Sequence, residues 1–221
     1  MEDFIKSTLS DAGKALLSYI NADYATTAKK SNIDIVTEAD LASENIIVAA
    51  IKSRFPEHGI ISEELGEYNA DAENIWYIDP LDGTRNFKSK VPLFGINIAM
   101  SHKGDFQYAA IYLPMLDEFC FAEKGKGAYI NGRKMSCSSS DAWESAYGIV
   151  APDISKSFRD FLENFEMLSK GSGWITAIAA PSVCGVWVAD GRRDWYVGPS
   201  TKSWDYAAPA LIAKEAGCAV K

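Results

Sequence analysis

The sequence predicts an α+β fold in which helices and sheets form separate layers. Amphipathic helical segments alternate in blocks with short apolar runs that are bounded by glycine, proline and asparagine. Tight turns join most of these runs, which favours antiparallel hairpins over parallel units with long crossovers. The chain has 221 residues, 48% of them hydrophobic, and no repeat or linker. We therefore expect one domain that spans residues 1–221.

The first part of the chain predicts two helices. Residues 1–20 carry apolar side chains at helical spacing, namely Phe4, Ile5, Leu9, Leu16, Leu17 and Ile20. A brief strand is expected near 33–37, where apolar and polar residues alternate. The second helix is expected over 38–54, with Asp40 in its first turn, where an acid is favourable. Pro56 and Gly59 end it.

The middle of the chain predicts strands. "GIISEE" (59–64) is a short strand that carries Glu63 to its end, and the apolar run 75–78 leads directly to Asp79. The clearest hairpin spans 94–114 around Lys103-Gly104-Asp105. "DEFCFAE" (117–123) is a further strand, and Asn131-Gly132 predicts a tight turn.

The last third of the chain predicts three helices and one strand. An amphipathic helix is expected at 155–165, and the uncharged run 174–189 predicts a helix in the core. "WYV" (195–197) predicts a strand, and residues 204–216 predict the last helix.

Composition excludes several classes of function. The net charge is −8 and there is no basic run, so nucleic acid is not expected as the main partner. The two histidines make a zinc site improbable, and the four cysteines have no CxxC spacing. We therefore expect reduced thiols in a cytoplasmic protein. The N-terminus is unlike a signal peptide, and the longest uncharged run, 16 residues, is short for a membrane span.

The stretch "WYIDPLDGTRNF" (76–87) carries the chemistry. A strand that Pro80 is expected to stop brings Asp79 and Asp82 together, followed by Gly83 and by Thr84 as the cap of a helix. This arrangement suits a phosphate held by backbone N–H groups and by Mg²⁺ bound to the carboxylates. It matches neither an EF-hand loop nor a P-loop, and its aspartates are too far apart for the usual aspartyl-phosphatase pair. A simple strand-ending turn remains the alternative.

Five segments in order extend this motif. They are "DIVTEAD" (34–40), "SEE" (62–64), "WYIDPLDGTRNF" (76–87), "GKGAYINGRKM" (125–135) and "WDYAAPALIAKEAG" (204–217). Together they resemble the inositol monophosphatase family of magnesium-dependent, lithium-sensitive phosphatases, over nearly the whole chain. The resemblance implies a layered αβαβα sandwich, two to three Mg²⁺ ions per site and hydrolysis by a metal-activated water.

The resemblance also implies metal ligands. Glu63, Asp79 and the backbone carbonyl of Leu81 would hold the first ion. Asp79, Asp82 and Asp205 would hold the second, and a more weakly bound third ion would use Glu63 and waters. Such ions remove the cost of burying adjacent carboxylates.

Further roles follow from the same resemblance. Thr84, paired with Asp40, would orient the attacking water, and Glu63 would take part in catalysis through the third ion. Gly83 and Thr84 would offer backbone N–H groups to the phosphate. Lys29 would lie on a mobile loop near the third metal ion.

Several positions depart from the family pattern. Arg85 stands where a second threonine is common, and Ala179–Pro181 replaces a substrate-contacting Gly-Ser/Thr-Ala segment. A glutamate that binds a sugar hydroxyl is missing near Val197–Gly198. These changes weaken the assignment to inositol phosphate, and Arg85 is a candidate to bind a second anionic group. The chain stops at Lys221, so we expect either a minimal or a truncated member.

The leading hypothesis is a magnesium-dependent phosphomonoesterase that acts on a small polyol or sugar phosphate. Alternative substrates are fructose 1,6-bisphosphate, histidinol phosphate and 3′-phosphoadenosine 5′-phosphate. A non-catalytic regulator is the alternative from another class. We expect a small phosphorylated metabolite as the partner, no membrane association, and a homodimer.

Overall fold

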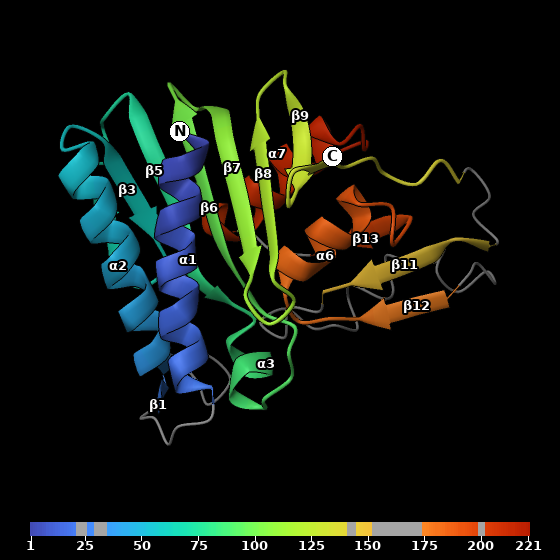
Figure 1. Cartoon of the computed structure of the whole chain (residues 1–221), viewed down its shortest axis with the longest axis horizontal. Helices are drawn as coiled ribbons and strands as arrows, with labels where there is room; N and C mark the ends of the chain where they lie inside the picture. Colours follow the sequence, from blue (N-terminus) through green and yellow to red (C-terminus); the bar gives the residue numbers. More distant parts are fainter. Residues whose placement is uncertain (21–25, 29–34, 141–144, 152–173, 199–201) are drawn as a thin grey trace.

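The computed structural model of the chain has alternating layers of helices and strands (Figure 1). It describes all residues except 21–25, 29–34, 141–144, 152–173 and 199–201. The helices are α1 (Glu2–Tyr19), α2 (Glu38–Arg54), α3 (Thr84–Lys88), α6 (Pro181–Ala189) and α7 (Ser203–Glu215). None of the helices in this described part is long and apolar enough to cross a bilayer.

The largest element is an eight-stranded sheet with the strand order β10-β9-β8-β7-β6-β5-β3-β4. Neighbouring strands are antiparallel except for the parallel pair β3 and β5. Asn131 and Gly132 have φ values of 47° and 80°, which is the turn that the Asn-Gly pair predicts between the last two strands. The strands are β3 (Gly59–Ser62), β4 (Gly66–Tyr68), β5 (Asn74–Asp82), β6 (Gly95–His102), β7 (Asp105–Leu113), β8 (Glu118–Glu123), β9 (Gly127–Ile130) and β10 (Arg133–Lys134).

Two smaller sheets complete the described strands. β11 (Tyr147–Val150) lies between β12 (Trp174–Ala177) and β13 (Trp195–Val197), and all three run parallel. β1 (Thr26–Ala28) and β2 (Ile35–Thr37) form an antiparallel ribbon just before α2.

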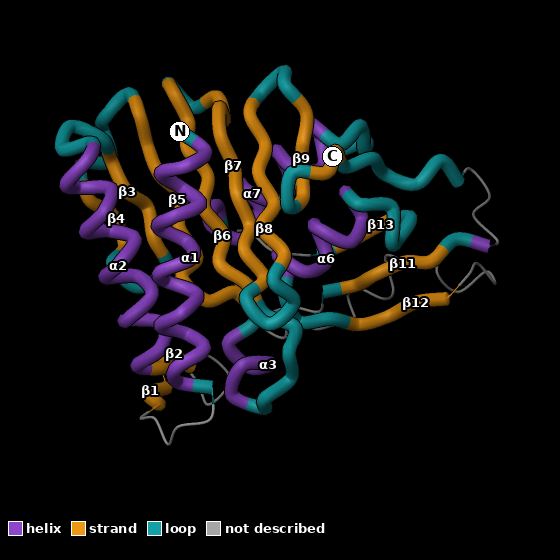
Figure 2. Tube along the Cα trace, viewed as in Figure 1, coloured by secondary structure: helices purple, strands orange, loops and turns teal. Residues whose placement is uncertain are grey.

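Two hydrophobic cores lie on opposite faces of the large sheet. On one face α1 and α2 pack side by side against the strands (Figure 2). Leu9, Ile47 and Trp76 are fully buried in the core on this face. On the other face α6 and α7 pack against the sheet, and Ile149 of β11 joins the same core. The order helix, large sheet, helix, small sheet confirms the layered α+β prediction. The helix expected at 155–165 lies outside the described residues.

Two sequence predictions about these layers are wrong. Leu17 was expected on the buried face of the first helix, but it is 37% exposed. The uncharged run 174–189 is not one buried helix: residues 174–177 form the edge strand β12, and only 181–189 form α6. Trp174 is 72% exposed, so the start of this run is not part of the core.

Candidate active site

A β-bulge places Asp79 and Asp82 on the same face of the large sheet. Residues three apart in a regular strand point to opposite faces. Here Asp79 pairs with Asn97 and Asp82 pairs with Gly95, so three steps on β5 match two on β6. The extra residue restores a shared direction for the two carboxylates.

The strand does not stop at Pro80, contrary to the sequence prediction. β5 continues to Asp82. Its neighbour β3 pairs only as far as Ile78, so the missing N–H of Pro80 costs no hydrogen bond on that side. The bulge absorbs the irregularity on the other side.

The carboxylates of Asp79 and Asp82 are buried and act on each other. Their residues are only 2% and 5% exposed. Burial raises the pKa of Asp82 to about 8, and the negative charges of Asp205 and Glu63 add to the shift. Burial also raises the pKa of Asp79 well above its usual range, with further contributions from Glu63, Asp82, Asp205 and Asp40. The five acids therefore share one electrostatic site, although they come from four separate segments.

Each of the remaining acids reaches this site from a different element. Glu63 directly follows β3, and its backbone N–H donates to the carbonyl oxygen of Ile78 at 3.2 Å. Asp205 lies in the first turn of α7. Asp40 lies in the first turn of α2 and is 1% exposed. All three acids lie near enough to Asp79 for their charges to raise its pKa, in addition to the effect of burial.

Thr84 links Asp40 to the bulge. Its hydroxyl lies 3.3 Å from Asp40 Oδ1 and 3.1 Å from the carbonyl oxygen of Leu81, so its single proton has two acceptors. The amide N–H of Leu81 in turn donates to Asp79 Oδ1 at 3.1 Å. The sequence predicted Thr84 as the cap of this helix, and that prediction is wrong. Thr84 is the first residue of α3, and Gly83 holds the cap position.

A glycine is required at position 83 because of the backbone conformation there and because neighbouring atoms leave no space for a side chain. Its φ is +85°, a conformation that L side chains rarely adopt. A Cβ atom there would lie 3.0 Å from Ala180 Cβ and 3.2 Å from the carbonyl oxygen of Leu93. The segment before α6 is therefore packed directly against the site. This is the Ala179–Pro181 segment that departs from the family pattern.

Asp82 also acts as the cap of α6. Ala180 holds the cap position but has no side-chain acceptor, and Pro181 has no N–H. The N–H of Ser182 donates to Asp82 Oδ2, and this bond opposes the rise in the pKa of Asp82. Sequence reasoning missed this contact, because 100 residues separate the two partners.

The donor set fits Mg²⁺ by its chemistry. The candidate ligands are all oxygen atoms, which Mg²⁺ prefers, and burial and neighbouring negative charges raise the pKa values of Asp79 and Asp82. The side chain of Asn97, fully buried opposite Asp79, has no hydrogen-bond partner among the described residues. Within that same part of the chain, no three acidic, histidine or cysteine side chains are already gathered tightly enough to enclose an ion.

Other predicted positions lie at or beyond the edge of this site. Arg85 is partly buried on α3, next to Thr84. Val197 ends β13, and its carbonyl oxygen accepts a hydrogen bond from the N–H of Ala151 at 3.0 Å. Lys29 lies outside the described residues, so its predicted role stays a prediction.

Comparison with known proteins supports the family resemblance. The sequence pattern of the inositol monophosphatase family matches residues 1–221. The Nus factor SuhB of Pseudomonas aeruginosa is 36% identical over 207 residues, which cover 88% of this chain and 74% of that protein. A fructose-1,6-bisphosphatase/inositol-1-monophosphatase of Thermotoga maritima is 32% identical over 216 residues, covering 97% and 82%.

Solved structures show the same fold. The extragenic suppressor protein SuhB of Bartonella henselae superposes with a TM-score of 0.92 at 27% identity, over 98% of this chain and 84% of that one. The IMPase of Thermotoga maritima superposes with a TM-score of 0.88 at 31% identity, over the same shares. With the family pattern matched from the first residue to the last, the chain belongs to the inositol monophosphatase family.

Proposed function

We propose that this chain is a magnesium-dependent phosphomonoesterase that hydrolyses a small polyol or sugar phosphate. The observation that carries the proposal is the bulge in β5, which turns Asp79 and Asp82 to one face. There burial, together with the charges of the neighbouring acids, raises the pKa of Asp79. Such a concentration of buried negative charge is costly unless cations bind to it.

The proposed ligands divide between two ions. Glu63, Asp79 and the carbonyl of Leu81 would hold one. Asp79, Asp82 and Asp205 would hold the other, and a third ion would rest on Glu63. Bound magnesium would supply an activated water and stabilise the charge on the entering and leaving oxygens.

The chain's own residues would then orient the water and the phosphate. When the Thr84 hydroxyl donates to Asp40, a lone pair of its oxygen is left to accept a hydrogen bond from a water and so to orient it. The backbone N–H groups of Gly83 and Thr84 would bind the phosphate. Because α3 is only five residues long, these individual N–H groups matter more than a helix dipole.

The second candidate is a regulatory protein without a required activity. Several relatives carry the name Nus factor SuhB, including one that is 36% identical. Against it stands the complete acid set at 63, 79, 82 and 205, which a purely regulatory protein does not need.

We further propose that this protein is a cytoplasmic homodimer and that lithium inhibits its activity.

Phosphate release from a panel of small phosphomonoesters, with and without Mg²⁺, tests the proposal. Asp82→Asn should lower turnover by about 100-fold or more, because one ion loses a charged ligand. Asp71→Asn, at an exposed position, is the control for the same chemical change and should leave the rate intact. Undiminished hydrolysis by Asp82→Asn, or equal rates with chelator and with Mg²⁺, would disprove the assignment.

A further inference from the structure

A buried glutamate on α2 holds the segment that carries Glu63. Glu44 is 6% exposed, and its Oε1 atom accepts hydrogen bonds from the Ser62 hydroxyl and from two backbone N–H groups. The N–H of Glu64 lies 3.2 Å away and that of Leu65 lies 2.9 Å away. The three donors flank Glu63 on both sides.

The backbone of Glu63 is thereby fixed between two elements. Its own N–H is bonded to the carbonyl of Ile78 on β5, while its neighbours are bonded to Glu44 on α2. Glu63 itself follows the end of β3, beyond the last ladder pair at Ser62. Without Glu44 the backbone N–H groups of Glu64 and Leu65 would lose these hydrogen bonds to α2.

The same face of α2 reaches the other two segments of the site. Positions 40, 43 and 44 are spaced so that their side chains lie on one face of the helix. The Ser43 hydroxyl donates to the carbonyl oxygen of Pro80, in the bulge, at 2.7 Å, and both residues are buried. Asp40 lies beside Thr84. One helix face therefore contacts the segment after β3, the bulge and the start of α3.

We propose that Glu44 is a positioning residue for magnesium: it sets the place of Glu63 relative to the bulge that carries Asp79 and Asp82. The inference rests on the proposed function, since it concerns the same metal site. An apolar side chain would fill the space at less desolvation cost, but it would leave the N–H groups of Glu64 and Leu65 without their acceptor. The carboxylate oxygen is suited to this place because one acceptor can serve several converging donors.

Three variants separate positioning from general stability. Glu44→Ala removes the acceptor, whereas Glu44→Gln keeps an acceptor oxygen of similar reach. Ile51→Ala is the matched control: Ile51 is fully buried on the same helix, two turns further along and in the apolar core. Each variant is assessed by thermal unfolding without metal and by calorimetric titration with Mg²⁺ at a temperature where it is folded.

Glu44→Ala should bind Mg²⁺ at least about tenfold more weakly, as is usual when a residue that orients a metal ligand is lost. Glu44→Gln should stay within about threefold of the wild type, because its amide oxygen still accepts the backbone donors. Ile51→Ala should unfold at a lower temperature but bind Mg²⁺ like the wild type. If Glu44→Ala does not fold, Ser62→Ala removes one donor and should weaken Mg²⁺ binding in the same direction.

Two results would overturn the inference. One is unchanged Mg²⁺ affinity in Glu44→Ala, or in Ser62→Ala where it has to serve instead. The other is an equal loss of affinity in Ile51→Ala, which would mean that any destabilisation of α2 has this effect. A wild-type chain that binds Mg²⁺ but releases no phosphate from the panel would refute only the proposed function, since the binding experiment does not depend on turnover.

Discussion

The indole N–H of Trp76 donates a hydrogen bond to Nδ1 of His58 at 3.0 Å. Trp76 is fully buried on β5, and His58 stacks on Phe55 with ring centroids 4.8 Å apart. The bond requires Nδ1 to be unprotonated, so the proton of the neutral ring is assigned to Nε2. Partial burial lowers the pKa of His58 below its usual 6.5.

This bond predicts a loss of stability in mild acid. As pH falls through about 6.5, the unfolded chain takes up a proton at His58 before the folded chain does, so the free energy of unfolding decreases. His58→Gln, whose amide oxygen can still accept from Trp76, should lack this component. Urea unfolding between pH 7.5 and 5.5 measures it, with His102→Gln at the exposed end of β6 as the control. An unchanged pH slope in His58→Gln would contradict the assignment.

Gly83→Ala should damage the site beyond the strain of its φ angle. Gly104 has a similar φ of +81° but no atom within 4 Å of an added Cβ, whereas Gly83 would press on Ala180 and Leu93. Both substitutions should cost about 1–2 kcal/mol for the left-handed backbone. Only Gly83→Ala should also reduce phosphate release, by about 100-fold, because a small displacement of Thr84 disturbs the reacting geometry. Equal activity of the two variants would show that the contact with Ala180 has no role in catalysis.

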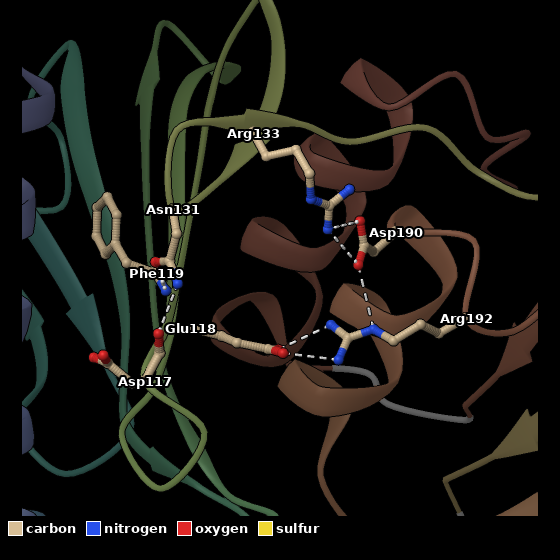
Figure 3. A network of polar contacts seen from close by, with 7 residues as sticks. All are labelled: Asp117, Glu118, Phe119, Asn131, Arg133, Asp190 and Arg192. Carbon is tan, nitrogen blue, oxygen red and sulfur yellow. Dashed lines mark hydrogen bonds and ion pairs between the residues drawn. The ribbon is translucent and has the colours of Figure 1, made fainter.

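Asp190→Ala should destabilise the fold. Asp190 forms an ion pair with Arg133 at 2.8 Å and another with Arg192 at 3.4 Å. Arg192 also donates two 2.9 Å hydrogen bonds to Glu118 of β8 (Figure 3). The Asp190 side chain is only 8% exposed, so its loss should lower the free energy of unfolding by about 1.5–3 kcal/mol.

The control for this network is Asp105→Ala. The side chains of Asp105 and Lys124 are 57% and 45% exposed, so the loss of this pair should destabilise the fold less than the loss of Asp190. Urea unfolding compares the two variants at pH 7. If both variants lose the same free energy of unfolding, the stabilising role assigned to Asp190 is wrong.

Local signals predicted much of the fold correctly. The helix expected over 38–54 has these same bounds, because acids at its start, bases at its end and the following Pro56 all mark it. The run 174–189 was predicted wrongly because a continuous apolar run has no period that separates a buried helix from a strand. Its β-branched and aromatic start, Trp174–Thr176, was the available signal for a strand.

The site was harder to predict where partners are distant in sequence. The acids at 63, 79, 82 and 205 were expected at the site from the family resemblance. The bulge was not expected, because it depends on the register between two strands, which no local pattern specifies. Glu44 was missed for a similar reason, since its donors lie 18 to 21 residues away. One signal was available: Glu44 shares its helix face with Ile47 and Ile51, and a glutamate on an apolar face needs a partner.

Arg85 should determine the choice of substrate. It directly follows Thr84, while Ala179–Pro181, which packs against Gly83, offers few side-chain partners for sugar hydroxyls. Since unpaired polar groups lose affinity sharply, a polyol should bind poorly there, and an arginine is well suited to a second phosphate. We therefore expect fructose 1,6-bisphosphate to be hydrolysed with a higher kcat/KM than inositol 1-phosphate.

Arg85→Ala should remove this preference without removing catalysis. The kcat/KM for the bisphosphate should fall by about 10- to 100-fold, the usual value of a charged hydrogen bond, and that for a simple monoester should change by less than about threefold. Lys88→Ala, an exposed cation on the same short helix, is the control for a general loss of positive charge and should leave the ranking unchanged. If inositol 1-phosphate ranks first and Arg85→Ala preserves that order, substrate selection depends on other residues, and the departures at 85 and 179–181 do not exclude a polyol.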